Sequence, residues 1–371
     1  MTEENSPKSH LRRIKLAGYK SIKELDLEMR PINILIGANG SGKSNFISIF
    51  SLLRALSQGK FQSYVKEESG GANNLLHFGG KNTSEILIDI DVSNNGYHAE
   101  LSHDVFEDTL VFRDEYCKFN NYHTTYPVKG KNGESGLYEG EAASGPVRAY
   151  TRRYLNKCQV HHFHDTGKLA GFKQSSPLGA TDFLYTDARN IAAFLYTLKE
   201  NWHESYQSVV DAVRTVAPFF HDFYLEPRGE GEKQSILLKW THRKSDEPFS
   251  AQQLSDGTAR FICMAALFLQ PAHLKPQTII LDEPELGLHP AALEVLADII
   301  KSVSKTNQVI CSTQSVTFSN CFEPADFVVV DQVEGVSSFA RQDVTSLQKW
   351  LENYKMGDIW NKNLIGGRPE W

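Results

Sequence analysis

Residues 32–44 read INILIGANGSGKS, and this stretch decides the fold class. Its first five residues form an apolar run, which predicts a strand buried on both faces, as in a parallel sheet. Residues 37–44 fit the pattern GxxxxGK[ST]. Apolar residues then recur at helical spacing over residues 46–56, and Gly59 is expected to end this helix. Strand, glycine-rich loop and helix in this order predict an α/β protein with a phosphate-binding loop.

The glycine-rich loop has the composition that phosphate binding requires. Glycines let successive backbone N–H groups converge on phosphate oxygens, and the helix start adds the positive end of its dipole. Lys43 is expected to reach the β- and γ-phosphates, and the Ser44 hydroxyl to bind Mg²⁺. A glycine-rich turn with a surface lysine is the alternative. We predict a nucleotide site made by Gly37, Ala38, Asn39, Gly40, Ser41, Gly42, Lys43 and Ser44.

A second apolar stretch, residues 278–281, ends in acidic residues. Asp282 at its end is placed to hold Mg²⁺ through water, and Glu283 to orient the attacking water or accept its proton. A third stretch, residues 308–311, precedes Ser312. Ligands of open α/β sheets bind at the carboxyl ends of strands, so we expect the loops after these strands and the glycine-rich loop to form one pocket. A solvated acidic turn is the alternative.

The remaining pattern divides the chain into two parts. Short strands are expected at residues 14–16, 25–29, 85–92, 97–101, 109–112 and 327–330. Between residues 114 and 231 the sequence becomes polar, glycine-rich and aromatic-rich, with one helix whose apolar stripe runs from Ala188 to about Val216. We predict one α/β unit made by residues 1–113 and 232–371, into which residues 114–231 are inserted.

Composition and charge exclude several classes of protein. The longest apolar run, residues 261–269, is less than half of the roughly 20 residues that a membrane span needs, so no membrane segment is expected. The first residues lack the apolar stretch of a secretory signal. Five cysteines without a CxxC pair indicate reduced thiols in a cytoplasmic protein. A net charge of −6 gives no overall attraction to nucleic acid.

A further motif, LSDGT at residues 254–258, opens an apolar helix 28 residues before Asp282. Because this motif lies between the glycine-rich loop and LDEP at residues 281–284, it resembles the signature motif of the ABC-type ATPase superfamily. The chain is more closely similar to the RecF- and SMC-related branch, in particular the OLD-like predicted ATPases of bacteria. The resemblance covers most of the chain and is carried by residues 14–45, LSDGTARF at 254–261, IILDEPELGLHP at 279–290, VICSTQS at 309–315, HHFHDTGKLAGFK at 161–173, NIAAFLYTLK at 190–199 and LENYKMGDIWNKNLIGGRPEW at 351–371.

The resemblance implies a P-loop ABC-type ATPase head, which is a mixed sheet flanked by helices and joined by an antiparallel β subdomain. The insertion is then a mixed, partly helical subdomain. Such a head dimerises around two ATP molecules with Mg²⁺. In the dimer, Ser255 and Gly257 of one subunit face four residues of the other: Lys43, Ser44, Asp282 and Glu283. Residues 287–290 then match the D-loop along the dimer seam. Ser255 as an ordinary helix N-cap is the alternative.

Further positions of the family are matched, substituted or unassigned in this chain. Lys20 and Ser21 match a turn that lies beside the nucleotide in the family. Asp282 corresponds to the Walker-B aspartate of the superfamily. Most of its members have a histidine after the strand that follows this motif, where this chain has Gln314. An amide donates to the γ-phosphate and accepts from water, but it cannot carry positive charge, so we expect slow hydrolysis. Gln314 as an ordinary loop residue is the alternative. The family's Q-loop glutamine is not assigned; Gln58 and Gln62 are candidates.

The expected function is an ATP-hydrolysing head that switches between open and closed dimers and passes this change to DNA, RNA or a partner protein. A separate nuclease or other effector is a plausible partner, since ATPases of bacterial defence and repair modules are among the resembling proteins. A built-in nuclease is not expected, because 88 residues follow Glu283. The alternatives are a transport ATPase subunit, which LSDGT instead of LSGGQ argues against, and a nucleotide-dependent scaffold with little turnover.

Two polar clusters invite other readings. His161, His162 and His164 suggest a metal site, but ligands at recognisable spacing do not accompany them, so ordinary histidines are favoured. The basic residues between 148 and 157 suggest a nucleic-acid contact, although such runs are more often a solvated face.

Overall fold

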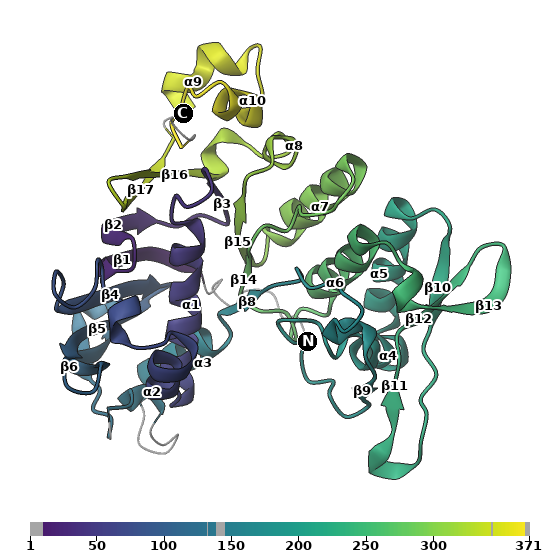
Figure 1. Ribbon diagram of the computed structural model, residues 1–371, viewed down its shortest axis with the longest axis horizontal. Helices are drawn as coiled ribbons and strands as arrows, with labels where there is room; N and C mark the ends of the chain where they lie inside the picture. The colour runs from purple at the N-terminus through teal and green to yellow at the C-terminus, as the bar shows by residue number, and fades with distance from the viewer. Residues whose placement is uncertain (1–9, 132, 139–144, 343, 368–371) are drawn as a thin grey trace. The chain divides into compact units, whose positions relative to one another are not determined.

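The computed structural model describes residues 10–131, 133–138, 145–342 and 344–367 (Figure 1). Contacts between residues divide the chain into two compact units. The first comprises the described parts of Met1–Val160, Pro276–Asp282 and Ser304–Trp371, and the second His161–Lys275 and Glu283–Val303. Each unit has its own sheets and helices.

The first unit contains a six-stranded antiparallel sheet. In its third strand, exposed or partly exposed residues alternate with buried ones, because successive side chains of a strand point to opposite faces. One face of the sheet therefore supplies the core. The strands lie in the order β2 (Ile22–Glu28), β1 (Leu11–Tyr19), β4 (Glu85–Val92), β5 (Asn95–Asp104), β6 (Thr109–Phe119) and β7 (Thr124–Pro127).

A second, mixed sheet also belongs to the first unit, except for the last residue of its edge strand. Its strands lie in the order β17 (Val336–Arg341), β16 (Phe327–Val333), β3 (Ile32–Ile36), β15 (Gln308–Thr313), β14 (Thr278–Leu281) and β8 (Gln159–His161). β15 runs parallel to β3 and to β14, and β16 runs parallel to β3. All residues of β3, β14 and β15 are buried, as expected for strands covered on both faces.

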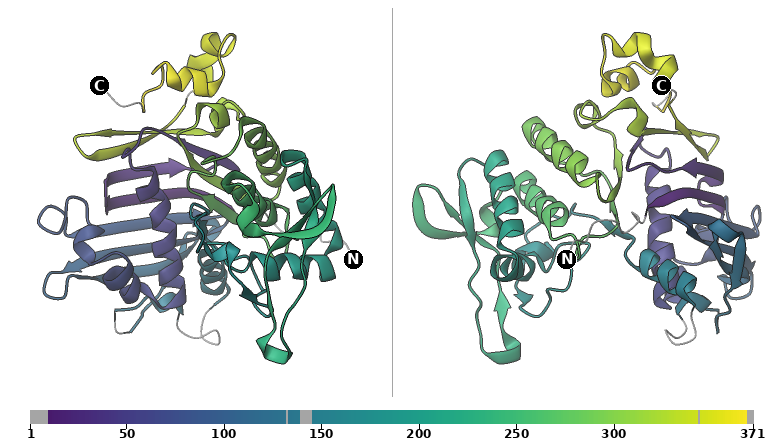
Figure 2. Two further views of the ribbon diagram at one scale, coloured as in Figure 1. Left: turned by 45° about the vertical axis from the view of Figure 1, so that its right-hand side comes forward. Right: turned by 180° about the vertical axis from the view of Figure 1, so that it is seen from behind.

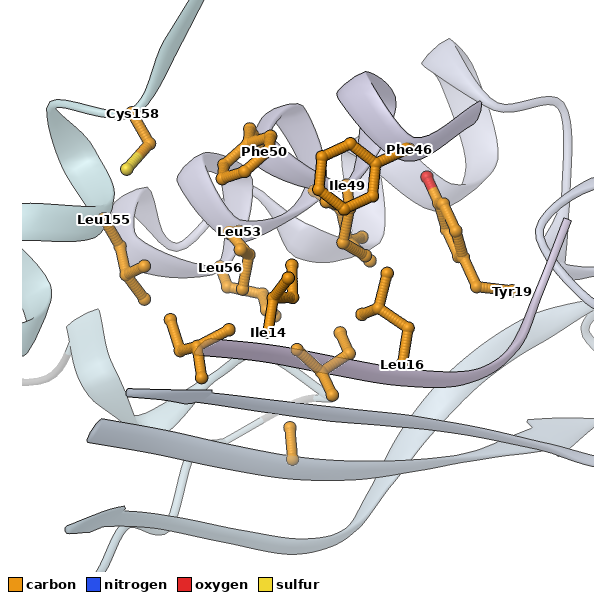
Figure 3. Close-up of a cluster of buried hydrophobic side chains, with 14 of the residues drawn as sticks. Ile14, Leu16, Tyr19, Phe46, Ile49, Phe50, Leu53, Leu56, Leu155 and Cys158 are labelled. Atoms are coloured by element: carbon orange, nitrogen blue, oxygen red, sulfur yellow. The ribbon is translucent and has the colours of Figure 1, made fainter. Parts of the chain in front are cut away.

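Helix α1 (Lys43–Gln58) lies across the antiparallel sheet (Figure 2). Its side chains Ile49, Leu53 and Leu56 point toward Ile14 and Leu16 of β1 (Figure 3). Apolar residues of both sheets belong to the same buried cluster, so the helix that follows the glycine-rich loop packs in a core that the two sheets share. It ends at a left-handed Gly59 with φ 67°, as the sequence predicts.

Shorter helices complete the first unit. α3 packs against α1, and α10 against α8. Their bounds are α2 (Phe61–Ser63), α3 (Pro146–Asn156), α8 (Val316–Ser319), α9 (Val344–Leu351) and α10 (Met356–Asn361).

The second unit combines four longer helices with a small sheet. α5 (His203–Val216) packs against α4 (Ile191–Asn201), α6 (Asp256–Leu269) and α7 (Pro290–Val303). Strands β10 (Phe220–Tyr224), β12 (Lys239–His242) and β13 (Ser245–Ser250) form an antiparallel sheet, and β9 (Ser176–Pro177) pairs with β11 (Ser235–Ile236). The prediction of a single helix up to Val216 is wrong, because Trp202 (φ −140°, ψ 64°) leaves the helical region and separates α4 from α5.

The predicted strands at residues 32–36, 85–92 and 278–281 have the observed bounds. The others are longer than predicted, and the one predicted at 25–29 ends one residue early, at Glu28. The predicted boundary at residues 113–114 falls inside β6, and the compact units divide the chain at other points than the predicted head and insertion. The functional division into a head and an inserted subdomain stays a prediction. The last four residues of the resembling C-terminal stretch lie outside the described residues.

Candidate functional site

Strand register brings three loops to one edge of the mixed sheet. β15 lies between β3 and β14, with Thr313 opposite Ile36 and Cys311 opposite Leu281. Gly37 and Gln314 directly follow the Ile36–Thr313 pair in the chain, and Asp282 follows Leu281 next to Ser312. The glycine-rich loop, the Gln314 loop and Asp282 therefore meet at the carboxyl ends of parallel strands, where open α/β sheets bind ligands.

The glycine-rich loop has the backbone that its glycines permit. Gly40 and Gly42 adopt left-handed φ angles of 80° and 109°. A Cβ atom on Gly42 would lie 2.1 Å from the hydroxyl of Ser337, so this position has no room for a side chain. The Lys43 ammonium donates to the carbonyl oxygens of Gly37 and Ala38 at 2.8 Å each, and the residue is only 4% exposed. The lysine is thus held within the curve of the loop.

The turn at Lys20 and Ser21 packs against the first turns of α1. Lys20 has φ 48°, and its ammonium donates to the Ser48 hydroxyl at 2.8 Å. Burial lowers the pKa of this ammonium. The Ser21 hydroxyl accepts from the Asn45 amide at 2.7 Å. Both predicted residues therefore lie beside the helix that follows the glycine-rich loop.

Ser337 links the turn, the loop and β17. Its hydroxyl lies 2.6 Å from the Ser41 carbonyl oxygen and 2.7 Å from the Ser21 hydroxyl. The sequence gives no signal for this role, because Ser337 belongs to a strand about 300 residues away along the chain and no motif surrounds it.

The carboxylate of Asp282, the predicted Walker-B residue, is held by its neighbouring strand. The Ser312 hydroxyl donates to Asp282, and Ser312 is fully buried. Ser312 is the penultimate residue of β15, so the prediction that it lies past the strand end is wrong. Gln314 follows the strand, and Ser315 then caps α8 by accepting from the Phe318 N–H at 3.1 Å. Glu283 follows Asp282 directly and has a left-handed φ of 45°.

The LSDG motif begins α6 in the second unit. Ser255 is its N-cap and accepts from the Thr258 N–H at 3.2 Å. A Cβ atom on Gly257 would lie 2.3 Å from the carbonyl oxygen of Gly287, so the motif packs on the predicted D-loop. Arg260, which the sequence analysis missed, donates to the carbonyl oxygens of Leu286, of Phe163 and of His164. The sequence signal that could have indicated this role is the presence of an arginine within the largely apolar helix α6.

The two Q-loop candidates are engaged at the other end of α1 from the glycine-rich loop. Gln58, the last residue of α1, donates to Asn156 at 2.8 Å. The Gln62 amide donates to the carbonyl oxygens of Leu110 and Gly133 at 2.9 and 2.8 Å. Because α1 spans roughly 24 Å, both glutamines lie far from the glycine-rich loop. Their hydrogen bonds therefore stabilise the fold of the subdomain.

The other clusters are also engaged in the fold. Arg152 donates to the Ser57 carbonyl oxygen at 3.3 Å and lies 5.2 Å from the Tyr138 ring centre, so this part of the basic stretch is not a free surface. His161 is buried. In the described residues, no group of three or more His, Cys, Asp or Glu side chains is placed to hold a metal ion. Over the same ranges, no helix has both the length and the apolar character of a membrane span.

Comparisons with known proteins agree with this geometry. Residues 10–135 match the family described as AAA ATPase domain. Residues 139–320 match a family of AAA domains described also as a candidate AbiEii toxin of a type IV TA system. The chain is 24% identical to the Old nuclease of Escherichia phage P2 over 92% of its length, and 20% identical to the OLD nuclease of Thermus scotoductus over 94%. The predicted resemblance to OLD-like ATPases is confirmed.

The chain spans 62% of the length of the phage Old nuclease and 67% of the Thermus protein. Two SMC heads have the same fold. An SMC head solved with the C-terminal winged-helix domain of ScpA superposes with a TM-score of 0.54, covering 92% of this chain and 99% of that one at 17% identity. The corresponding Pyrococcus furiosus complex gives 0.52, with 92% and 98% covered at 13% identity. The predicted fold, that of an ABC-type ATPase head as in SMC proteins, is confirmed.

Proposed function

We propose that the chain binds ATP with Mg²⁺ at residues 37–44 and hydrolyses it. The observation that carries the proposal is the order of the mixed sheet, in which β15 lies between β3 and β14, so that the glycine-rich loop, Gln314 and Asp282 all follow the carboxyl ends of neighbouring parallel strands. A glycine-rich loop that only began a helix would not need the carboxylate of Asp282 and the amide of Gln314 at the ends of the neighbouring strands. The similarity to AAA ATPase domains supports the same activity.

The residues divide the chemistry among them. Lys43 would neutralise the β- and γ-phosphates, and Glu283 would orient the attacking water and accept its proton. Gln314 would donate its amide N–H groups to the γ-phosphate. Ser44 and Asp282 provide oxygen atoms, which suit Mg²⁺, and they would hold it. When bound, the ion would offset phosphate charge; the lysine and the loop N–H groups bind and orient the triphosphate.

The proposal includes an ATP-dependent dimer. In this dimer, the γ-phosphate held by one copy meets Ser255 and Gly257 of the other, at the start of α6, whose N–H groups favour an anion. The similarity to SMC heads supports this part of the proposal. Closing and opening of the dimer would then act on DNA or on a partner protein, and the OLD nuclease relatives favour a nuclease as that partner.

Turnover measured with purified protein tests the enzyme assignment. We expect Mg²⁺-dependent phosphate release that Glu283→Gln lowers by about 10²-fold or more while ATP binding is kept, because a general base contributes about that factor. Glu294→Gln, on the exposed side of α7, is the matched control. Lys43→Ala should abolish binding. Binding without phosphate release by the wild type would favour the scaffold, and full turnover in Glu283→Gln would contradict the role of Glu283.

Light scattering after size exclusion tests the dimer. In the Glu283→Gln background, ATP should shift the mass from one chain to two, and Ser255→Arg should prevent the shift without loss of ATP binding. Ser302→Arg, on the exposed end of α7, should leave the shift intact. A dimer that forms equally in the Ser255→Arg protein would rule out this arrangement.

A further inference from the structure

The segment from Met356 to Gly367, here called the C-terminal segment, contacts the glycine-rich loop. The carbonyl oxygen of Gly367 accepts from the Ala38 N–H at 2.7 Å. The indole N–H of Trp360 donates to the same oxygen at 3.3 Å. The Gly367 N–H in turn donates to the Asp331 carboxylate of β16 at 3.3 Å. Gly367 and Trp360 are buried, so these bonds form inside the first unit.

The contact depends on a pair of glycines. Gly366 and Gly367 have φ angles of 78° and 75°, which L-residues rarely adopt. A Cβ atom on Gly367 would lie 2.9 Å from a methyl of Val329 and 3.2 Å from the carbonyl oxygen of Val330. The left-handed turn lays the Gly367 backbone against β16 and aims its carbonyl oxygen at Ala38. The position therefore requires glycine for space as well as for conformation.

The other end of the C-terminal segment holds α8, the helix that follows Gln314. The Asn320 side-chain oxygen accepts from the N–H groups of Gly357 and Asp358 at 2.8 and 3.3 Å. A Cβ atom on Gly357 would lie 2.2 Å from the Val316 carbonyl oxygen, so the two backbones are in close contact. Figure 1 shows α10 beside α8.

We propose that the C-terminal segment positions the two halves of the ATP site relative to each other. It holds the start of the glycine-rich loop through Gly367 and the Gln314 loop through Asn320. Because the Ala38 N–H is bonded to Gly367, the entry to the loop is fixed, and the N–H groups that follow are set to converge on phosphate. The same segment holds α8, which begins two residues after Gln314, and so limits the movement of the Gln314 loop. This inference rests on the proposed ATPase function and adds positioning residues to it.

The two ends of the segment predict different kinetic effects. Gly367→Ala disturbs the loop that binds ATP, so the Kd for a fluorescent ATP analogue should rise about fivefold, as expected for the loss of about one hydrogen bond. Gly231→Ala is the matched control, since Gly231 also has a positive φ of 56° but meets nothing within 4 Å of a Cβ. Asn320→Ala should lower kcat about fivefold and leave the Kd unchanged.

A double variant that exchanges the side chains at positions 320 and 358 distinguishes a positioning role of Asn320 from a loss of stability. Asn320 lies 3.5 Å from the Asp358 carboxylate, so Asn320→Asp together with Asp358→Asn keeps an acceptor at position 320 without opposing two carboxylates. This double variant should recover kcat. Equal Kd values for Gly367→Ala and Gly231→Ala, or an unchanged kcat in Asn320→Ala, would overturn the inference while the ATPase proposal stands. Wild-type protein that does not bind ATP would overturn both.

Discussion

The hydroxyl of Ser312 donates a hydrogen bond to the carboxylate of Asp282. Ser312 lies in β15, and Asp282 directly follows the adjacent parallel strand β14, one position past the Leu281–Cys311 pair. Ser312 is fully buried, so the donor is rigid, and a hydrogen bond to an ionised acceptor is stronger than one between neutral groups. The strand next to Asp282 thus fixes the orientation of the carboxylate that we propose as a Mg²⁺ ligand.

Ser312→Ala should lower the apparent affinity for Mg²⁺ during turnover. Without the donor, Asp282 loses about 1.5–3 kcal/mol of hydrogen bonding, which corresponds to roughly tenfold or more in apparent Mg²⁺ affinity during turnover. Phosphate release measured across a Mg²⁺ titration would show this as a shifted midpoint. Ser302→Ala, at an exposed position of α7, is the control. An unshifted midpoint would mean that Ser312 does not orient the carboxylate.

Gly42→Ala should abolish ATP binding. The added methyl would meet the Ser337 hydroxyl at 2.1 Å, and the φ of 109° is unfavourable for alanine. Gly40→Ala shares the positive φ, but a Cβ there meets nothing within 4 Å, so its effect should be much smaller. Titration with a fluorescent ATP analogue compares the two. Similar Kd values for both variants would refute the role of the Ser337 contact.

Glu115 is a buried carboxyl group in the antiparallel subdomain. It accepts from the Tyr97 hydroxyl at 2.7 Å, from the Gly136 N–H at 3.0 Å and from the Ser135 hydroxyl. These bonds tie the loop around residue 135 to β5 and β6. Burial is the largest cause of the raised pKa of Glu115, and the hydrogen bonds partly oppose it.

The raised pKa predicts how stability changes with pH. The folded chain binds the Glu115 proton more tightly than the unfolded chain, so this contribution is complete below the ordinary value of 4.5 and is lost as the pH rises through the folded value. Glu115→Gln should therefore flatten the decline of the free energy of unfolding that begins as the pH rises above 4.5. Urea unfolding of both proteins across this range is the measurement, and parallel curves would contradict it.

One thiol should react much faster than the other four. Burial raises the pKa of Cys117, Cys158 and Cys263 to about 12, and Cys311 is also buried. Cys321 is half-buried. Because the thiolate is the reactive form, a disulfide reagent should label one group quickly in the folded protein and all five after unfolding. Cys321→Ser should remove the fast phase; if the fast phase survives, another thiol opens to solvent.

Local signals explain what the sequence predicted well. The apolar run before Gly37, the helical spacing after Lys43 and the stop at Gly59 are all properties of neighbouring residues, and the structure has each of them. The break at Trp202 was missed because the apolar stripe continues in phase on both sides of one non-helical residue.

Contacts between distant residues could not be predicted. Ser337 reaches Ser41 across 296 residues, and neither position carries a periodic or motif signal for the other. The bond between Gly367 and Ala38 is of the same kind, since it uses backbone atoms that are common to every residue. The order of the motifs predicted which loops lie at the same edge of the sheet. The contacts of side chains such as Ser337, Asn45 and Arg260 could be found only in the structure.

The central place of β3 in the mixed sheet also bears on biosynthesis. β3 is made early, but Asn33 meets its neighbour Val309 only 276 residues later. At usual elongation speeds of about 5–20 residues per second, the nascent chain carries this apolar strand without either flanking strand for roughly 14–55 seconds. An uncovered strand edge invites pairing with other chains, so the newly made protein is expected to depend on chaperones during this interval.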